Sequence, residues 1–175
     1  MQFRDRTIAD RFAEHFEGLS FNLSTGTESK CENWIHEDPE CNWWVTVIPS
    51  DISRSGVNSE NDCIELSELG FRLYKHLLSA PPFRYALAGI EVDDFSYYTD
   101  LFKSVCTYPD GRNALHGFTG LVLQKELWQE LGKPISFGEF GPDHLWVPYY
   151  GRVVSLARKH DTQRFISRTA IIFHS

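Results

Sequence analysis

In several segments of this chain, apolar residues recur every three to four positions, and this spacing predicts its helices. An i, i+3, i+4 period of apolar side chains is typical of a helix with one buried face. Four segments follow it, over about 5–17, 62–80, 94–105 and 124–131. The second shows it most clearly, with a possible cap at Asp62 and an end before Pro81 and Pro82. Its stripe is formed by Leu66, Leu69, Leu73 and Leu77.

Short runs of β-branched and aromatic residues predict the strands. The run over 42–48 ends at a proline, and 83–92 is apolar enough to form a central strand buried on both faces. Shorter strands are expected at 120–123, within 135–151 and at 169–173.

Three stretches lack such periods, and the loops are predicted there. Residues 20–40 are expected to form a loop with at most one short strand, and 50–61 an exposed loop. For 153–167 helix is favoured over strand. Short helices and strands in irregular order favour an α+β fold, in which one domain packs a mixed, largely antiparallel sheet with three to four helices. A doubly wound fold is the second choice.

Length and charge restrict the class of protein. At 175 residues the chain fits a single domain, 1–175. Its net charge is −7, and residues 1–70 carry 14 carboxylates against 5 basic groups. Such a surface repels phosphate, so general nucleic-acid binding is not expected. The basic residues after Gly151 could pair with the acidic half of the protein. Alternatively, they leave a narrow possibility of nucleic-acid binding through this segment.

The length of the apolar runs and the residues at the start of the sequence indicate the cellular compartment. No run approaches the roughly 18 apolar residues that span a bilayer, and residues 1–6 do not begin a signal peptide. We therefore expect a cytoplasmic protein without membrane contact. There the four cysteines are expected to be free thiols.

Motifs for nucleotide binding, acyl hydrolysis and zinc binding are missing from the sequence. It contains no glycine-rich phosphate loop, no G-x-S-x-G, no H-E-x-x-H and no C-x-x-C. Cys31, His36 and Cys41 are the nearest set to a metal site, but their spacing is loose and a fourth ligand is missing. We favour incidental cysteines in a loop, and no cofactor is expected.

Two carboxylates near the end of the apolar run 83–92 are the best catalytic candidates. Glu91 and Asp93 would lie on the same side of the strand, where they could hold Mg²⁺ or act as acid and base. The competing interpretation, which we favour, is that both lie in water while Asp94 caps the next helix. His144, with Asp143 beside it, could serve as a base only in a loop.

Aromatic side chains are the best candidates for a binding surface. Trp34 lies in the acidic segment, and Trp146, Tyr149 and Tyr150 lie in a Gly/Pro-rich stretch. Such residues give large contact areas at interfaces, but they could equally close one end of the core. Cys63, in the first turn of a predicted helix, is surrounded by carboxylates and is interpreted as structural.

Two functions follow as hypotheses. The first is a non-enzymatic protein that binds a basic protein partner, as inhibitors of bacterial nuclease toxins do; this is an analogy of class only. The alternative is a small metal-dependent hydrolase that uses Glu91 and Asp93.

Overall fold

The computed structural model describes residues 6–52, 57–90, 119–134, 137–151 and 169–174. Its helices are α1 (Arg6–Phe16), α2 (Glu60–Leu77) and α4 (Lys125–Glu130). Its strands are β1 (Ser20–Asn22), β2 (Glu28–Glu37), β3 (Trp43–Pro49), β4 (Tyr85–Ile90), β5 (Val122–Gln124), β6 (Gly138–Glu139), β7 (His144–Trp146) and β8 (Thr169–His174). Within these ranges, no helix has the length and apolar character needed to cross a bilayer.

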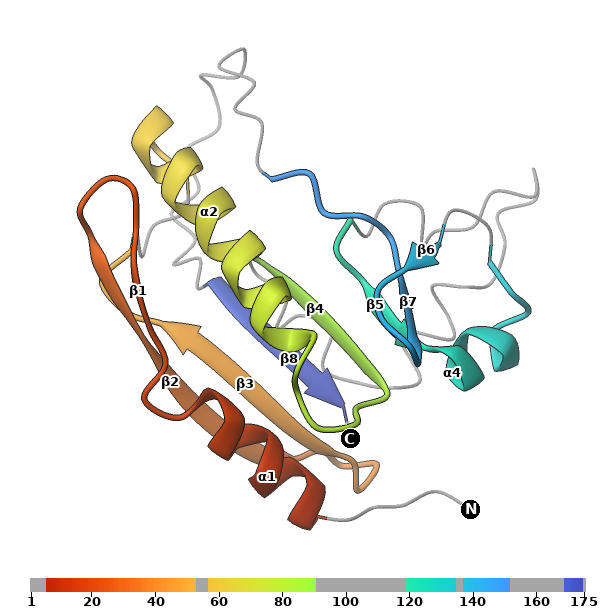
Figure 1. The fold of residues 1–175 in the computed structure, drawn as a ribbon. Coiled ribbons are helices and arrows are strands. Elements are labelled where there is room, and N and C mark those ends of the chain that lie inside the picture. Colours follow the sequence, from red (N-terminus) through yellow and green to blue (C-terminus); the bar gives the residue numbers. More distant parts are fainter. Residues whose placement is uncertain (1–5, 53–56, 91–118, 135–136, 152–168, 175) are drawn as a thin grey trace.

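The strands hydrogen-bond in the order β1-β2-β3-β8-β4-β5-β7-β6, and every pairing is antiparallel (Figure 1). The predicted combination of helices with antiparallel sheet is therefore confirmed. β1 pairs only with the first three residues of β2, in a ladder separate from the one that joins β2 to β3. The rest of β2 has β3 as its one strand neighbour in the described part of the chain.

The central strands bury alternate side chains in two different clusters. Ala86 and Ala88 of β4 belong to the cluster formed with α1 and α2. Tyr85 and Leu87, which point the other way, belong to the cluster formed with Leu127 of α4. Burial on both sides is what the apolar run at 83–92 predicted.

The helix α2 supplies much of the first cluster. Its four-leucine stripe is buried as predicted, whereas Phe71 and Leu78, which flank it, are about half exposed. The helix begins earlier than expected, because its cap is Ser59 and not Asp62. The Ser59 hydroxyl accepts from the Asp62 N–H, and the Asp62 carboxylate accepts from the Ser59 N–H. This reciprocal pair satisfies two backbone donors.

The prediction of a loop over 20–40 was wrong. This segment forms a β-hairpin, β1 and β2, which turns at Gly26 with a φ of +90°. The alternation was hidden because the inward residues of β2 include Ser29 and Cys31, which are small, while the outward ones are charged. The helix α1 contacts β2, and Cys31 belongs to the same buried cluster as Phe16 of that helix.

The turn from β2 to β3 is organised by one buried carboxylate. Asp38 accepts hydrogen bonds from the backbone N–H groups of Glu40 and Asn42, the Asn42 side chain and the indole of Trp44. Cys41 occupies the left-handed region, with a φ of +60°. Several donors on one carboxylate favour its charged form.

The remaining predicted strands and the helix at 124–131 are confirmed within one to two residues. Short strands within 135–151 are also present as β6 and β7. The predicted helix over 94–105 and the prediction for 153–167 lie outside the described residues.

Candidate functional site

An acidic groove lies between α1 and β2. Its volume is about 490 Å³, and its walls include three carboxylates and no lysine or arginine. The residues that line it are Asp10, Ala13, Glu14, Glu17, Gly18, Cys31, Asn33 and Ile35. The groove therefore presents negative charge next to β2, the strand along which α1 lies (Figure 1).

The two sides of α1 explain this charge. Phe12 and Phe16 are buried in the core, whereas Glu14 and Glu17 are exposed on the turns between and after them. Asp10 shares their side of the helix at i, i+4 spacing. It forms an exposed ion pair with Arg6 at 3.7 Å, so its charge is partly compensated. The groove carries the negative charge chiefly of Glu14 and Glu17.

Asn33 fixes the distance between the strand and the helix. Its Nδ2 donates to the Ala13 carbonyl at 2.8 Å, across the floor of the groove. Its Oδ1 is buried and accepts no hydrogen bond from the described residues. Cys31, beside it, is buried, and burial raises the pKa of its thiol to about 12. The thiol therefore stays protonated at neutral pH and adds no charge or nucleophile.

The backbone of β2 faces this groove at alternate residues. The Lys30 carbonyl accepts from Ser50 on the β3 side, and the Cys31 N–H donates to Leu19 on the β1 side. Strand geometry then directs the N–H and C=O groups of Asn33, Ile35 and Glu37 away from β3, to the edge. β1 does not extend to these residues.

Trp34 lies on the opposite face of this edge. Its side chain is 63% exposed, next to the outward carboxylate Glu32. An indole with so much exposed area is typical of a contact surface. The sequence predicted at most one short strand over 20–40, so it predicted neither the full length of β2 nor the groove beside it. The alternation of charged residues over 28–32 was the signal available.

The structure separates the other candidate residues. Cys31 and His36 point to opposite faces of β2, and the described residues contain no group of three or more His, Cys, Asp or Glu side chains that could hold a metal ion. Cys31, Cys41 and Cys63 form no disulfide in the described part of the chain, and Cys63 is buried. Glu91 and Asp93 lie outside the described residues, as does His116.

His144 has a structural environment. Its ring stacks on Phe83 at 4.0 Å between centroids, and its Nε2 lies 2.9 Å from the Phe83 carbonyl. Burial lowers its pKa, so the ring is neutral at pH 7, and the bonded Nε2 carries the proton. Asp143 is exposed, and its negative charge raises the pKa of the ring by less than burial lowers it.

The four aromatic candidates do not share one surface. Trp34 is on β2, whereas Trp146 is on β7 and Tyr149 and Tyr150 come soon after that strand. Four strands separate β2 from β7 in the sheet order. Tyr149 is buried against Tyr74, and Trp146 is half-buried, whereas Tyr150 is 75% exposed. Of the four, only Trp34 belongs to β2, on the face opposite the acidic groove.

Comparison of the chain with protein-family models, curated proteins and solved structures found no match. The functional argument therefore depends on the chemistry of the site.

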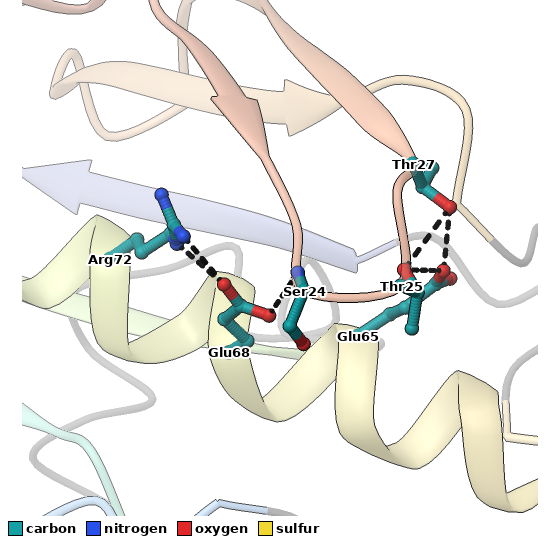
Figure 2. Close-up of polar contacts among 6 residues, drawn as sticks. All are labelled: Ser24, Thr25, Thr27, Glu65, Glu68 and Arg72. Carbon is teal, nitrogen blue, oxygen red and sulfur yellow. Dashed lines mark hydrogen bonds and ion pairs between the residues drawn. The ribbon is translucent and has the colours of Figure 1, made fainter.

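Two carboxylates of α2, those of Glu65 and Glu68, form hydrogen bonds and an ion pair with other residues of the protein. Figure 2 shows Glu65 accepting from the hydroxyls of Thr25 and Thr27, at 2.5 and 2.7 Å, at the tip of the β1–β2 hairpin. Glu68 accepts from the Ser24 N–H at 2.8 Å and pairs with Arg72 at 2.6 Å. These contacts fasten the hairpin to α2, and they hold the strand β2 that forms the groove.

Removing both carboxylates should loosen the hairpin tip. In Glu65→Ala/Glu68→Ala, we expect the Ser24 amide to exchange its hydrogen about fivefold faster, the effect of about 1 kcal/mol for a lost exposed bond. Amide hydrogen exchange followed by NMR measures this rate. Lys75→Ala, an exposed change on the same helix, is the control and should leave the rate unchanged. An unchanged exchange rate in the double variant would show that Glu65 and Glu68 do not hold the hairpin tip against α2.

A second hollow, of about 500 Å³, lies along α2 beside Ile64 and Phe71, which are about half exposed. Its walls carry the carboxylate of Glu68 together with the cationic groups of Arg72 and Lys75, so charges of both signs are present. Neither charge nor an orphaned polar group there indicates what it would bind. The α1–β2 groove is the better candidate because its charge has one sign.

Proposed function

We propose that this chain acts as one α+β domain that binds a basic protein, without catalysis of its own, through the acidic surface of α1 and β2. The observation that carries the proposal is the groove with Asp10, Glu14 and Glu17 on its walls and no basic residue among those that line it. In this picture the protein neutralises or shields its partner, as an inhibitor does.

The wider charge distribution supports the same function. Residues 1–70 hold 14 of the 24 carboxylates of the chain. Several belong to the elements that frame the groove, with Glu32 and Glu37 exposed on β2. A surface of one sign accelerates encounter with a partner of opposite charge and disfavours partners of like charge.

A selection experiment tests this function without a known partner. A random peptide library displayed on phage is selected on the immobilised protein, and we expect lysine- and arginine-rich sequences to be enriched. Their affinity should fall at least about tenfold when NaCl rises from about 0.1 M to about 1 M, because the screening length shortens from about 10 Å to about 3 Å.

Protein variants locate the binding. Glu14→Gln/Glu17→Gln should weaken the selected basic peptides by about tenfold at low salt, or about 1.4 kcal/mol. Glu126→Gln/Glu139→Gln is the matched control, because these exposed carboxylates lie on α4 and β6, at the other end of the strand order. Enrichment of neutral or acidic sequences would overturn the proposal, as would equal losses in the two variants.

A further inference from the structure

The structure assigns a binding geometry to the groove: we propose that the partner contributes an extended segment that adds as a strand to the outer edge of β2. Its alternate side chains would be Lys or Arg facing α1, and apolar residues facing Trp34. This inference rests on the proposed function, and it adds the backbone conformation and the side-chain pattern of the bound segment.

The backbone of β2 provides the first argument. Asn33, Ile35 and Glu37 direct an N–H and a C=O to the edge, and no described strand pairs with them. Such a row of donors and acceptors is a template for another strand, which would lie about 4.8 Å away. Recognition by strand addition uses main-chain bonds for affinity and alternate side chains for specificity.

The two faces of the edge provide the second argument. A strand added here projects every other side chain toward α1, across from Glu14 and Glu17, where the groove leaves about 490 Å³. Its remaining side chains project to the opposite face, beside Trp34, which is 63% exposed. One face therefore favours cations, and the other favours an apolar side chain where the segment meets Trp34, so the expected segment alternates between them.

Charge also decides between two possible occupants. A second copy of this chain could pair its own β2 edge with this one, as in a two-fold dimer. That pairing would bring two sets of Asp10, Glu14 and Glu17 together, and like charges facing each other disfavour an interface. A basic segment of another protein removes this repulsion.

The edge also has a defined end. Leu19 accepts from the Cys31 N–H, so β1 and the turn at Gly18 close one end of the groove. The added strand can therefore extend only from Asn33 toward Glu37. A short segment suffices, and Trp34 lies within its span.

The test uses a short synthetic peptide that alternates lysine with valine. It should bind the full-length protein, and Trp34→Ala should weaken it by about tenfold, a typical loss for an exposed aromatic anchor. The same peptide with N-methyl groups on alternate residues keeps its charge but loses the donors on one edge. If the strand is added as proposed, methylation on the edge that faces β2 abolishes binding, whereas methylation on the other edge does not.

The outcomes separate the two proposals. Equal binding of both methylated peptides overturns strand addition but leaves the acidic docking function standing. Failure of the lysine–valine peptide to bind better than a glutamate–valine peptide overturns both. The variant Ile35→Pro removes an outward donor together with the half-buried Ile35 side chain, so it should weaken binding of the peptide more than Ile35→Ala, which keeps the donor. A dimer in sedimentation experiments that Ile35→Pro converts to monomer would show that a second copy is the occupant, and the inference would be wrong.

Discussion

Replacing Gly120 with alanine is expected to destabilise the protein by about 4 kcal/mol, the sum of backbone strain and a steric clash. Gly120 has a φ of +94°, which a residue with a Cβ rarely adopts. A Cβ there would lie 2.0 Å from the hydroxyl of Tyr74. That hydroxyl is buried between α2 and β4, where it contacts both backbone groups of Ala88, so it has no free space into which to move.

Two control variants separate the causes. Gly26→Ala carries the strain alone, since Gly26 has a φ of +90° and nothing within 4 Å of a Cβ. Its cost should be about 1 kcal/mol. Tyr74→Phe removes the hydroxyl, so Gly120→Ala should cost less in a Tyr74→Phe background than in the wild type. Chemical denaturation measures all of these free energies. A Gly120→Ala loss equal to that of Gly26→Ala would contradict the clash.

Replacing Asp38 with alanine is expected to cost about 3 kcal/mol, because buried donors lose their acceptor. The indole of Trp44 is fully buried and donates to Asp38 at 2.8 Å, and the Asn42 N–H donates at 2.9 Å. Glu37→Ala, an exposed change at the end of β2, should alter stability by no more than about 0.5 kcal/mol. Equal losses in the two variants, measured by denaturation, would contradict this role.

The same network predicts a pH dependence. Burial alone would raise the pKa of Asp38, but hydrogen bonds from Asn42, Trp44 and Glu40 lower it overall. The charged form is therefore stabilised by folding. Its contribution is fully present above the ordinary pKa of 3.8 and is lost as the pH falls through the lowered folded value. The stability difference between wild type and Asp38→Asn should therefore shrink below about pH 3.8, and a constant difference would contradict this assignment.

The sequence predicted the elements whose buried residues are large and apolar. The leucine stripe of α2 and the β-branched run of β3 are of this kind. It failed at β2, where the small residues Ser29 and Cys31 fill the inward positions and leave no apolar alternation in the sequence. The predicted start of α2 was three residues too late, because Ser59 and Asp62 are both residue types that cap helices well. Only the reciprocal hydrogen bonds in the structure show that Ser59 is the cap.

The groove could not be predicted from local patterns. It exists because β1 pairs with only the first residues of β2, and because α1 crosses beside the rest. Both facts depend on register and packing between separate elements, which the spacing of residues along the chain does not encode. The acidic character of the segment was visible in the sequence, and the partner class was inferred from it.

Amide hydrogen exchange of β2, with and without the lysine–valine peptide, is the most direct test of the proposed docking. The account predicts that the edge-facing amides of Asn33, Ile35 and Glu37 become protected on binding. The amides of Trp34 and His36, which face β3, should change little. Protection that appears elsewhere while the edge-facing amides stay unchanged would contradict docking at this edge.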